Sequence, residues 1–181
     1  AHWGLTVLPG GDLASGGVSL ASLRQKWGSP LHVVLAEQLR RNVREFLAIN
    51  EGGRIRGEVF YSYKSNPIPG VLRVLHDLGI GAEVISEYEL WLALKLGVPA
   101  DRIVFNGPAK SLASVRNAVA RDILLLNINH REEIDVVVSV ARELNKRPSI
   151  GVRVATSGGW TGQFGLPAGT GEAFAALKEV H

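Results

Sequence analysis

The first strand of a regular repeating pattern begins in Glu58-Val59-Phe60-Tyr61-Ser62-Tyr63-Lys64-Ser65-Asn66-Pro67. It begins as a β-strand, because a valine and three aromatic residues stand close together in it. The strand stops before Pro67, since proline disfavours helix at the preceding residue and cannot donate a ladder hydrogen bond. Lys64 therefore falls at the C-terminal end of a strand, where a buried ammonium group is costly unless its charge is paired or removed. The alternative is a lysine that reaches from the strand end to solvent.

The same strand-then-helix pattern repeats five times from this stretch onward. We expect strands at 58–64, 82–86, 103–106, 123–128 and 150–155, and helices at 69–78, 87–96, 112–121, 131–144 and 172–180. Several of these strands are continuously apolar, as in a parallel sheet that is covered on both faces. Alternating units of this kind predict an α/β fold with a parallel sheet, either doubly wound or a (β/α)8 TIM barrel.

Even spacing of the units favours the barrel, because no long connection marks a switch point. A polar residue also stands at or near the end of each strand, and in a barrel these ends meet at one mouth. The five residues are Lys64, Ser86, Asn106, Asn129 and Arg153. Eight units need about 250 residues, so we expect five βα units of a barrel whose remainder lies outside this sequence.

The residues before the first unit have a different composition. Residues 1–22 are rich in glycine and serine, and we expect a loosely packed lead-in that ends in a short helix at 22–27. A strand is expected at 31–35 and a helix from residue 37 to about 49. We therefore divide the chain into residues 1–36, a lead-in with one strand, and residues 37–181, the partial barrel.

Composition excludes several classes of function. The chain has 181 residues, 46% of them hydrophobic and 20% charged, with a net charge of +3 and scattered basic residues, so we expect no binding to nucleic acid. It contains no cysteine, which removes disulfides, cysteine-ligated metals and cysteine nucleophiles and fits a cytoplasmic protein. The five histidines lack metal-ligand spacing, so no metal site is expected. No apolar run is long enough to span a membrane.

Five ordered motifs resemble those of the fold type III pyridoxal phosphate enzymes, in particular the diaminopimelate, ornithine and arginine decarboxylase group. Tyr61-Ser62-Tyr63-Lys64-Ser65-Asn66-Pro67 is similar to the family's Y-x-x-K-x-N-P, and 81–90 is similar to its G-A-D-V-x-S-x-x-E-L. Residues 102–111 resemble R-I-x-x-x-G/N-P-x-K-S, 153–156 resemble R-I-A-T, and 163–166 resemble K-F-G-L. The resemblance extends over about residues 30–170.

The resemblance implies a barrel of the alanine racemase-like type that binds pyridoxal 5'-phosphate, with Lys64 as the lysine that forms a Schiff base with the cofactor. Glu83 stands where the family has an aspartate close to that lysine, and a solvated carboxylate with a packing role is the alternative. Arg153 matches an arginine beside the cofactor, and a structural salt bridge is the alternative. Ser86 and Glu89 also match the family, but we favour a helix N-cap and its capping-box acid.

The resemblance further implies a homodimeric enzyme that decarboxylates an amino acid, either diaminopimelate-like or basic. The strand at 31–35 would join a C-terminal β-domain, which is missing here together with the groups that hold the cofactor's phosphate and ring nitrogen. We therefore expect these residues alone to be inactive and to bind the cofactor weakly. Two alternatives stay open, namely an inactive homologue that acts as a regulatory or binding partner and a racemase-type barrel.

Overall fold

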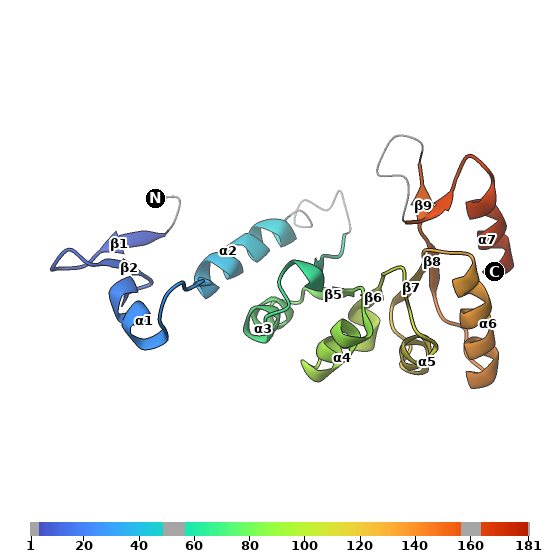
Figure 1. The fold of residues 1–181 in the computed structure, drawn as a ribbon, viewed down its shortest axis with the longest axis horizontal. Coiled ribbons are helices and arrows are strands. Elements are labelled where there is room, and N and C mark those ends of the chain that lie inside the picture. Colours follow the sequence, from blue (N-terminus) through green and yellow to red (C-terminus); the bar gives the residue numbers. More distant parts are fainter. Residues whose placement is uncertain (1–3, 49–56, 157–163, 181) are drawn as a thin grey trace. The chain divides into compact units, whose positions relative to one another are not determined.

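The computed structural model describes residues 4–48, 57–156 and 164–180. The chain forms two compact units, Ala1–Gly57 and Glu58–His181. Figure 1 shows the elements of both units. Among the helices in the described ranges, none combines the length and the apolar character that crossing a membrane requires.

The first unit begins with a small antiparallel sheet, not with the loosely packed lead-in that the sequence predicted. Its strands are β1 (Leu5–Val7), β2 (Leu13–Ser15) and β3 (Val18–Ser19), in the order β1-β2-β3. Ser15 pairs with Val18, so Gly16 and Gly17 form a two-residue turn, and their φ angles of 58° and 80° are those a tight hairpin requires. The glycines that suggested looseness are therefore turn residues.

Two helices complete the described part of this unit. They are α1 (Leu20–Trp27), which confirms the predicted short helix, and α2 (Ala36–Leu47). Ser19 is the N-cap of α1, because its hydroxyl accepts a hydrogen bond from the backbone N–H of Ser22. Residues 31–35, where the sequence predicts a strand that joins a β-domain, pair with no strand in the described part of the chain, and the strand stays a prediction.

The second unit is built on the predicted parallel sheet. Its strands are β4 (Phe60–Ser62), β5 (Gly81–Val84), β6 (Ile103–Phe105), β7 (Leu125–Ile128) and β8 (Ile150–Val152). They pair in chain order, β4-β5-β6-β7-β8, and every pair is parallel. No strand order reverses, so the sheet is an arc of a barrel rather than a doubly wound sheet.

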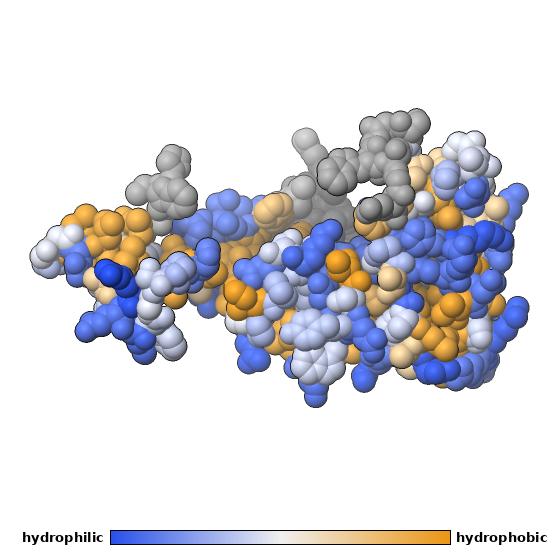
Figure 2. All heavy atoms as spheres, viewed as in Figure 1, coloured by the Kyte–Doolittle hydropathy of each residue, from blue (hydrophilic) through white to orange (hydrophobic). Residues whose placement is uncertain are grey.

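Helices cover one face of this sheet (Figure 1). They are α3 (Pro69–Asp77), α4 (Glu87–Lys95), α5 (Leu112–Ala120) and α6 (Glu132–Leu144), within two residues of the predicted bounds. The side chains of the covered face are fully buried, namely Ala82, Val84, Ile103, Phe105, Leu126 and Ile128. Figure 2 shows hydrophilic residues over much of the outer surface of these helices, with apolar residues between them.

The opposite face of the sheet is only half-buried. Its residues alternate with the buried ones along each strand and include Glu83, Val104, Asn106, Leu125 and Asn127. In a closed barrel this inner face is filled by side chains from all the strands. With only five strands in the sheet, side chains from the other strands of a closed barrel do not cover this face, and it stays half-buried.

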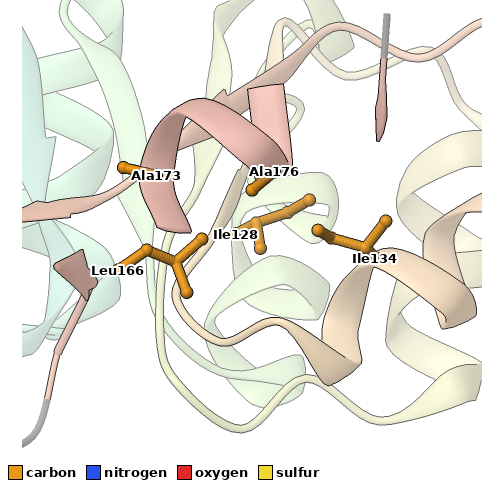
Figure 3. Packing of buried hydrophobic residues seen from close by; sticks show 5 residues of the cluster. All are labelled: Ile128, Ile134, Leu166, Ala173 and Ala176. Carbon is orange, nitrogen blue, oxygen red and sulfur yellow. The ribbon is translucent and has the colours of Figure 1, made fainter. Parts of the chain in front are cut away.

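The chain after β8 packs against the last strands and α6. Two short strands, β9 (Val154–Ala155) and β10 (Leu166–Pro167), pair in parallel and precede α7 (Glu172–Val180). The strand predicted at 150–155 is thus interrupted at Arg153. Figure 3 shows the cluster that holds these elements together, made of Ile128, Ile134, Leu166, Ala173 and Ala176.

Candidate active site

A cavity of about 660 Å³ lies at the C-terminal ends of the five parallel strands. The side chains around it come from all five strand ends and from the segment before β10. Its polar and aromatic lining residues are Lys64, Glu83, Asn106, Asn127, Arg153 and Phe164. The three residues that the sequence singled out for the cofactor, Lys64, Glu83 and Arg153, therefore border one space.

Lys64 lies just beyond β4, on the single 3-10 turn η2 (Tyr63–Ser65). The predicted strand ends two residues early because the backbone N–H of Asn66 donates to the carbonyl of Tyr63 at 3.1 Å and closes the turn. Lys64 is exposed, so the described residues do not supply the desolvation that the sequence argument expected.

The side chain of Tyr63, the first residue of this turn, anchors it in the protein interior. It is fully buried, and its hydroxyl lies 2.6 Å from Nε2 of His76, whose Nδ1 lies 2.8 Å from the carbonyl oxygen of Ile80. A carbonyl only accepts, so Nδ1 carries the proton and Nε2 accepts from the Tyr63 hydroxyl. Burial raises the pKa of Tyr63 and lowers the pKa of His76, which keeps both partners neutral.

Glu83 is held by a line of side-chain amides on the inner face. Nδ2 of Asn106 donates to Oε1 of Glu83 at 2.6 Å, and Nδ2 of Asn127 donates to Oδ1 of Asn106. The three residues lie on or just after β5, β6 and β7, and all are half-buried. Asn127 was not singled out from the sequence. The sequence did contain a signal for it, namely a polar amide within the apolar run 123–128. Because side chains alternate between the two faces of a strand, this amide falls on the inner face.

Arg153 is exposed and lies in the break between β8 and β9. The centre of its guanidinium is 4.7 Å from the ring centroid of Phe164, within the range of a cation–π contact. The backbone of Arg153 is fixed on both sides, because its N–H donates to Ile128 and its carbonyl accepts from Leu166. The aromatic ring and the two backbone bonds hold a positive charge at the edge of the cavity.

A buried ion pair joins a loop to a helix at the rim of the cavity. Nζ of Lys110 lies 3.0 Å from Oε1 of Glu133, and the two side chains are 2% and 12% exposed. Lys110 also donates to the carbonyl of Gly107 at 2.6 Å, and Nδ2 of Asn129 donates to the same oxygen. Desolvation lowers the pKa of Lys110, and the charge of Glu133 opposes that shift. Lys110 thus joins the β6–α5 loop to the start of α6.

Two of the five residues predicted at the mouth do not line the cavity. The hydroxyl of Ser86 accepts from the backbone N–H of Glu89, and the Glu89 carboxylate accepts from the backbone N–H of Ile85 at 2.7 Å. The predicted N-cap at Ser86 is therefore confirmed, whereas Glu89 accepts from the residue before the cap and not from the cap itself, as a capping box would require. Asn129 is fully buried in the rim, where its backbone N–H donates to Glu133.

The lining fits one end of a pyridoxal group. A primary amine can attach an aldehyde, Arg153 can pair with an anionic group, and Glu83 offers a fixed carboxylate within the same cavity. In addition, the Ser62 hydroxyl is buried opposite Glu83 in register and has no hydrogen-bond partner in the described part of the chain. A polar ligand on the inner face would satisfy it.

Comparison with known proteins agrees with this fit. The chain is 35% identical over 144 residues to a diaminopimelate decarboxylase of Aquifex aeolicus, across 80% of this chain and 33% of that protein. A diaminopimelate decarboxylase of Zymomonas mobilis is 30% identical, across 81% and 35%. The chain thus spans about a third of the length of these relatives.

A solved structure has the same fold. The diaminopimelate decarboxylase of Methanocaldococcus jannaschii, in complex with L-lysine, aligns with a TM-score of 0.87 at 27% identity, across 97% of this chain and 44% of that one. A family model described as "Pyridoxal-dependent decarboxylase, pyridoxal binding domain" matches residues 36–169. Since that match covers well over half of the chain, the chain belongs to the pyridoxal-dependent decarboxylases and carries part of their pyridoxal-binding barrel.

Proposed function

We propose that this chain is the pyridoxal-binding part of a pyridoxal phosphate-dependent amino-acid decarboxylase, and that Lys64 attaches the cofactor. The observation that carries the proposal is the grouping of Lys64, Glu83 and Arg153 around one cavity at the strand ends. Membership of the pyridoxal-dependent decarboxylases supports it. No observation favours an inactive homologue or a racemase, so neither is proposed.

Each of the three residues has a distinct task in this proposal. Lys64 would hold the cofactor through its primary amine, the group that can bond to an aldehyde. Arg153, which contacts the ring of Phe164, would pair with an anionic group of the cofactor or substrate. Glu83 places a carboxylate in the same cavity. The bound cofactor would supply the electron sink for loss of carbon dioxide.

The substrate, assembly and location are further parts of the proposal. Relatives that are named diaminopimelate decarboxylases, one of them in complex with L-lysine, support a diaminopimelate-like or basic amino acid. We also propose a homodimer and a cytoplasmic location, which the absence of cysteine fits. The division into residues 1–36, which would join a β-domain, and residues 37–181 stays a proposal.

Reductive trapping tests the role of Lys64. The protein is incubated with excess pyridoxal phosphate, reduced with borohydride and digested, and the labelled peptides are identified by mass. The label is expected on Lys64, and Lys64→Ala abolishes it. Lys95→Ala, which removes an exposed lysine of α4, is the matched control and leaves it intact. Equal labelling of several exposed lysines, or full labelling without Lys64, contradicts the proposal. Release of carbon dioxide from meso-diaminopimelate and L-lysine by the full-length protein then tests the substrate class.

A further inference from the structure

The carboxylate of Glu83 sets the direction of every hydrogen bond in the line that joins it to Asn106 and Asn127. A carboxylate only accepts, so Asn106 turns its Nδ2 toward Glu83 and leaves Oδ1 for its other neighbour. Asn127 donates its Nδ2 to Oδ1 of Asn106, so the Oδ1 of Asn127 is directed toward β8. The donor and acceptor atoms of both hydrogen bonds are therefore fixed by the carboxylate at one end.

The other end of the line lies against bare backbone. Asn127 pairs in register with Gly151 of β8. A Cβ atom added to Gly151 would lie 1.9 Å from Oδ1 of Asn127 and 3.1 Å from its Cγ. The amide thus occupies the space that any side chain at residue 151 would take. The line runs over four neighbouring strands, from the carboxylate on β5 to the glycine on β8.

We propose that Asn106 and Asn127 are positioning residues for Glu83, and that Gly151 is the residue that allows them to act. Glutamate is one methylene longer than the aspartate that the family has at this position. Its carboxylate therefore needs a restraint to stay at one place in the cavity. The bond from Asn106 engages Oε1 and leaves Oε2 outside the line. The inference rests on the proposed function in one respect, namely that the restraint keeps Glu83 in the cavity that Lys64 also lines.

The first test needs no cofactor. In isotopically labelled protein, the side-chain amide signals of Asn106 and Asn127 and the carboxyl carbon signal of Glu83 are followed by NMR. Gly151→Ala is expected to shift all three, because its methyl group displaces the flexible Asn127 side chain while the backbone stays in place. Gly70→Ala is the matched control, since a Cβ there meets nothing within 4 Å, and it should shift none.

A second variant keeps the test decisive. Asn106→Leu has a similar size but no polar atoms, and it is expected to shift the signals of Asn127 and Glu83. The proposal is overturned if Gly151→Ala moves the Asn127 signals alone, or if Asn106→Leu leaves the Glu83 signal in place.

The second test measures the rate of borohydride trapping at Lys64. Asn106→Leu and Gly151→Ala are expected to slow trapping about tenfold, because the carboxylate that shares the cavity with Lys64 has moved. Gly70→Ala should not change the rate. An unchanged rate in both variants contradicts a positioning role. If the unmodified protein is not trapped at Lys64, the proposed function fails, and the NMR test alone decides the role of Asn106, Asn127 and Gly151.

Discussion

Replacing Lys110 by methionine is expected to destabilise the second unit by about 3 kcal/mol, the lower end of the range for breaking a buried ion pair. Methionine keeps the length and apolar stem of lysine but leaves the carboxylate of Glu133 buried and unpaired. With 12% of its side chain exposed, Glu133 recovers little solvation. It does keep the backbone N–H groups of Asn129 at 2.7 Å and His130 at 3.4 Å, which is why we choose the lower end.

Urea unfolding followed by circular dichroism measures this loss, which amounts to on the order of a hundredfold in the folding equilibrium. Lys146→Met is the matched control, because Lys146 also pairs with a carboxylate, Asp122, but their side chains are 30% and 73% exposed. It should cost less than about 1 kcal/mol. Combining Lys110→Met with Glu133→Gln removes the stranded charge and should recover part of the stability. The reasoning is refuted if Lys110→Met costs no more than Lys146→Met, or if the double variant is the less stable one.

Three further predictions concern local features. Ser86→Ala should cost about 1 kcal/mol of unfolding free energy because α4 loses its cap, while Ser139→Ala on the exposed side of α6 should be neutral in the same urea titration. Stability should fall as the pH is lowered through 6.5, the ordinary pKa of histidine, because half-buried His76 has a lowered pKa and resists the proton that the unfolded chain binds. His76→Gln should flatten this dependence of the urea midpoint on pH. Gly107→Ala should cost about 1–3 kcal/mol, since its φ is 91° and a Cβ would lie 2.2 Å from the carbonyl oxygen of Ile85; an unchanged urea midpoint would contradict this.

Most of the barrel arc was predictable because its signals are local. Apolar strands, helical spacing and caps such as Ser111 gave the five βα units, and α7 has the predicted bounds of 172–180. The antiparallel sheet of the first unit was missed, because glycine pairs have the same composition in a tight turn as in a loose segment. Only the positive φ angles at Gly16 and Gly17 distinguish the two.

The candidate site was predictable where strand ends carry polar residues. Lys64, Asn106 and Arg153 line the cavity because the ends of parallel strands converge. The partner of Lys110 could not be predicted, since Glu133 is 23 residues away and no spacing rule connects a loop residue to the first turn of a later helix. Asn129 and Ser86 sit at strand ends as well, but their hydrogen-bonding groups are used inside the loops, so position alone did not separate lining residues from structural ones.

The carboxylates of Glu89 and Glu133 each accept the backbone N–H of a residue four positions earlier, Ile85 and Asn129, where a strand gives way to its helix. The loops that follow β5 and β7 are therefore each held by a side chain of the next helix, and these hydrogen bonds need no ligand. The turn that carries Lys64 is likewise anchored by buried Tyr63. The backbone on both sides of the cavity is therefore fixed by the chain itself, and adjustment to an incoming molecule falls to the exposed side chain of Lys64.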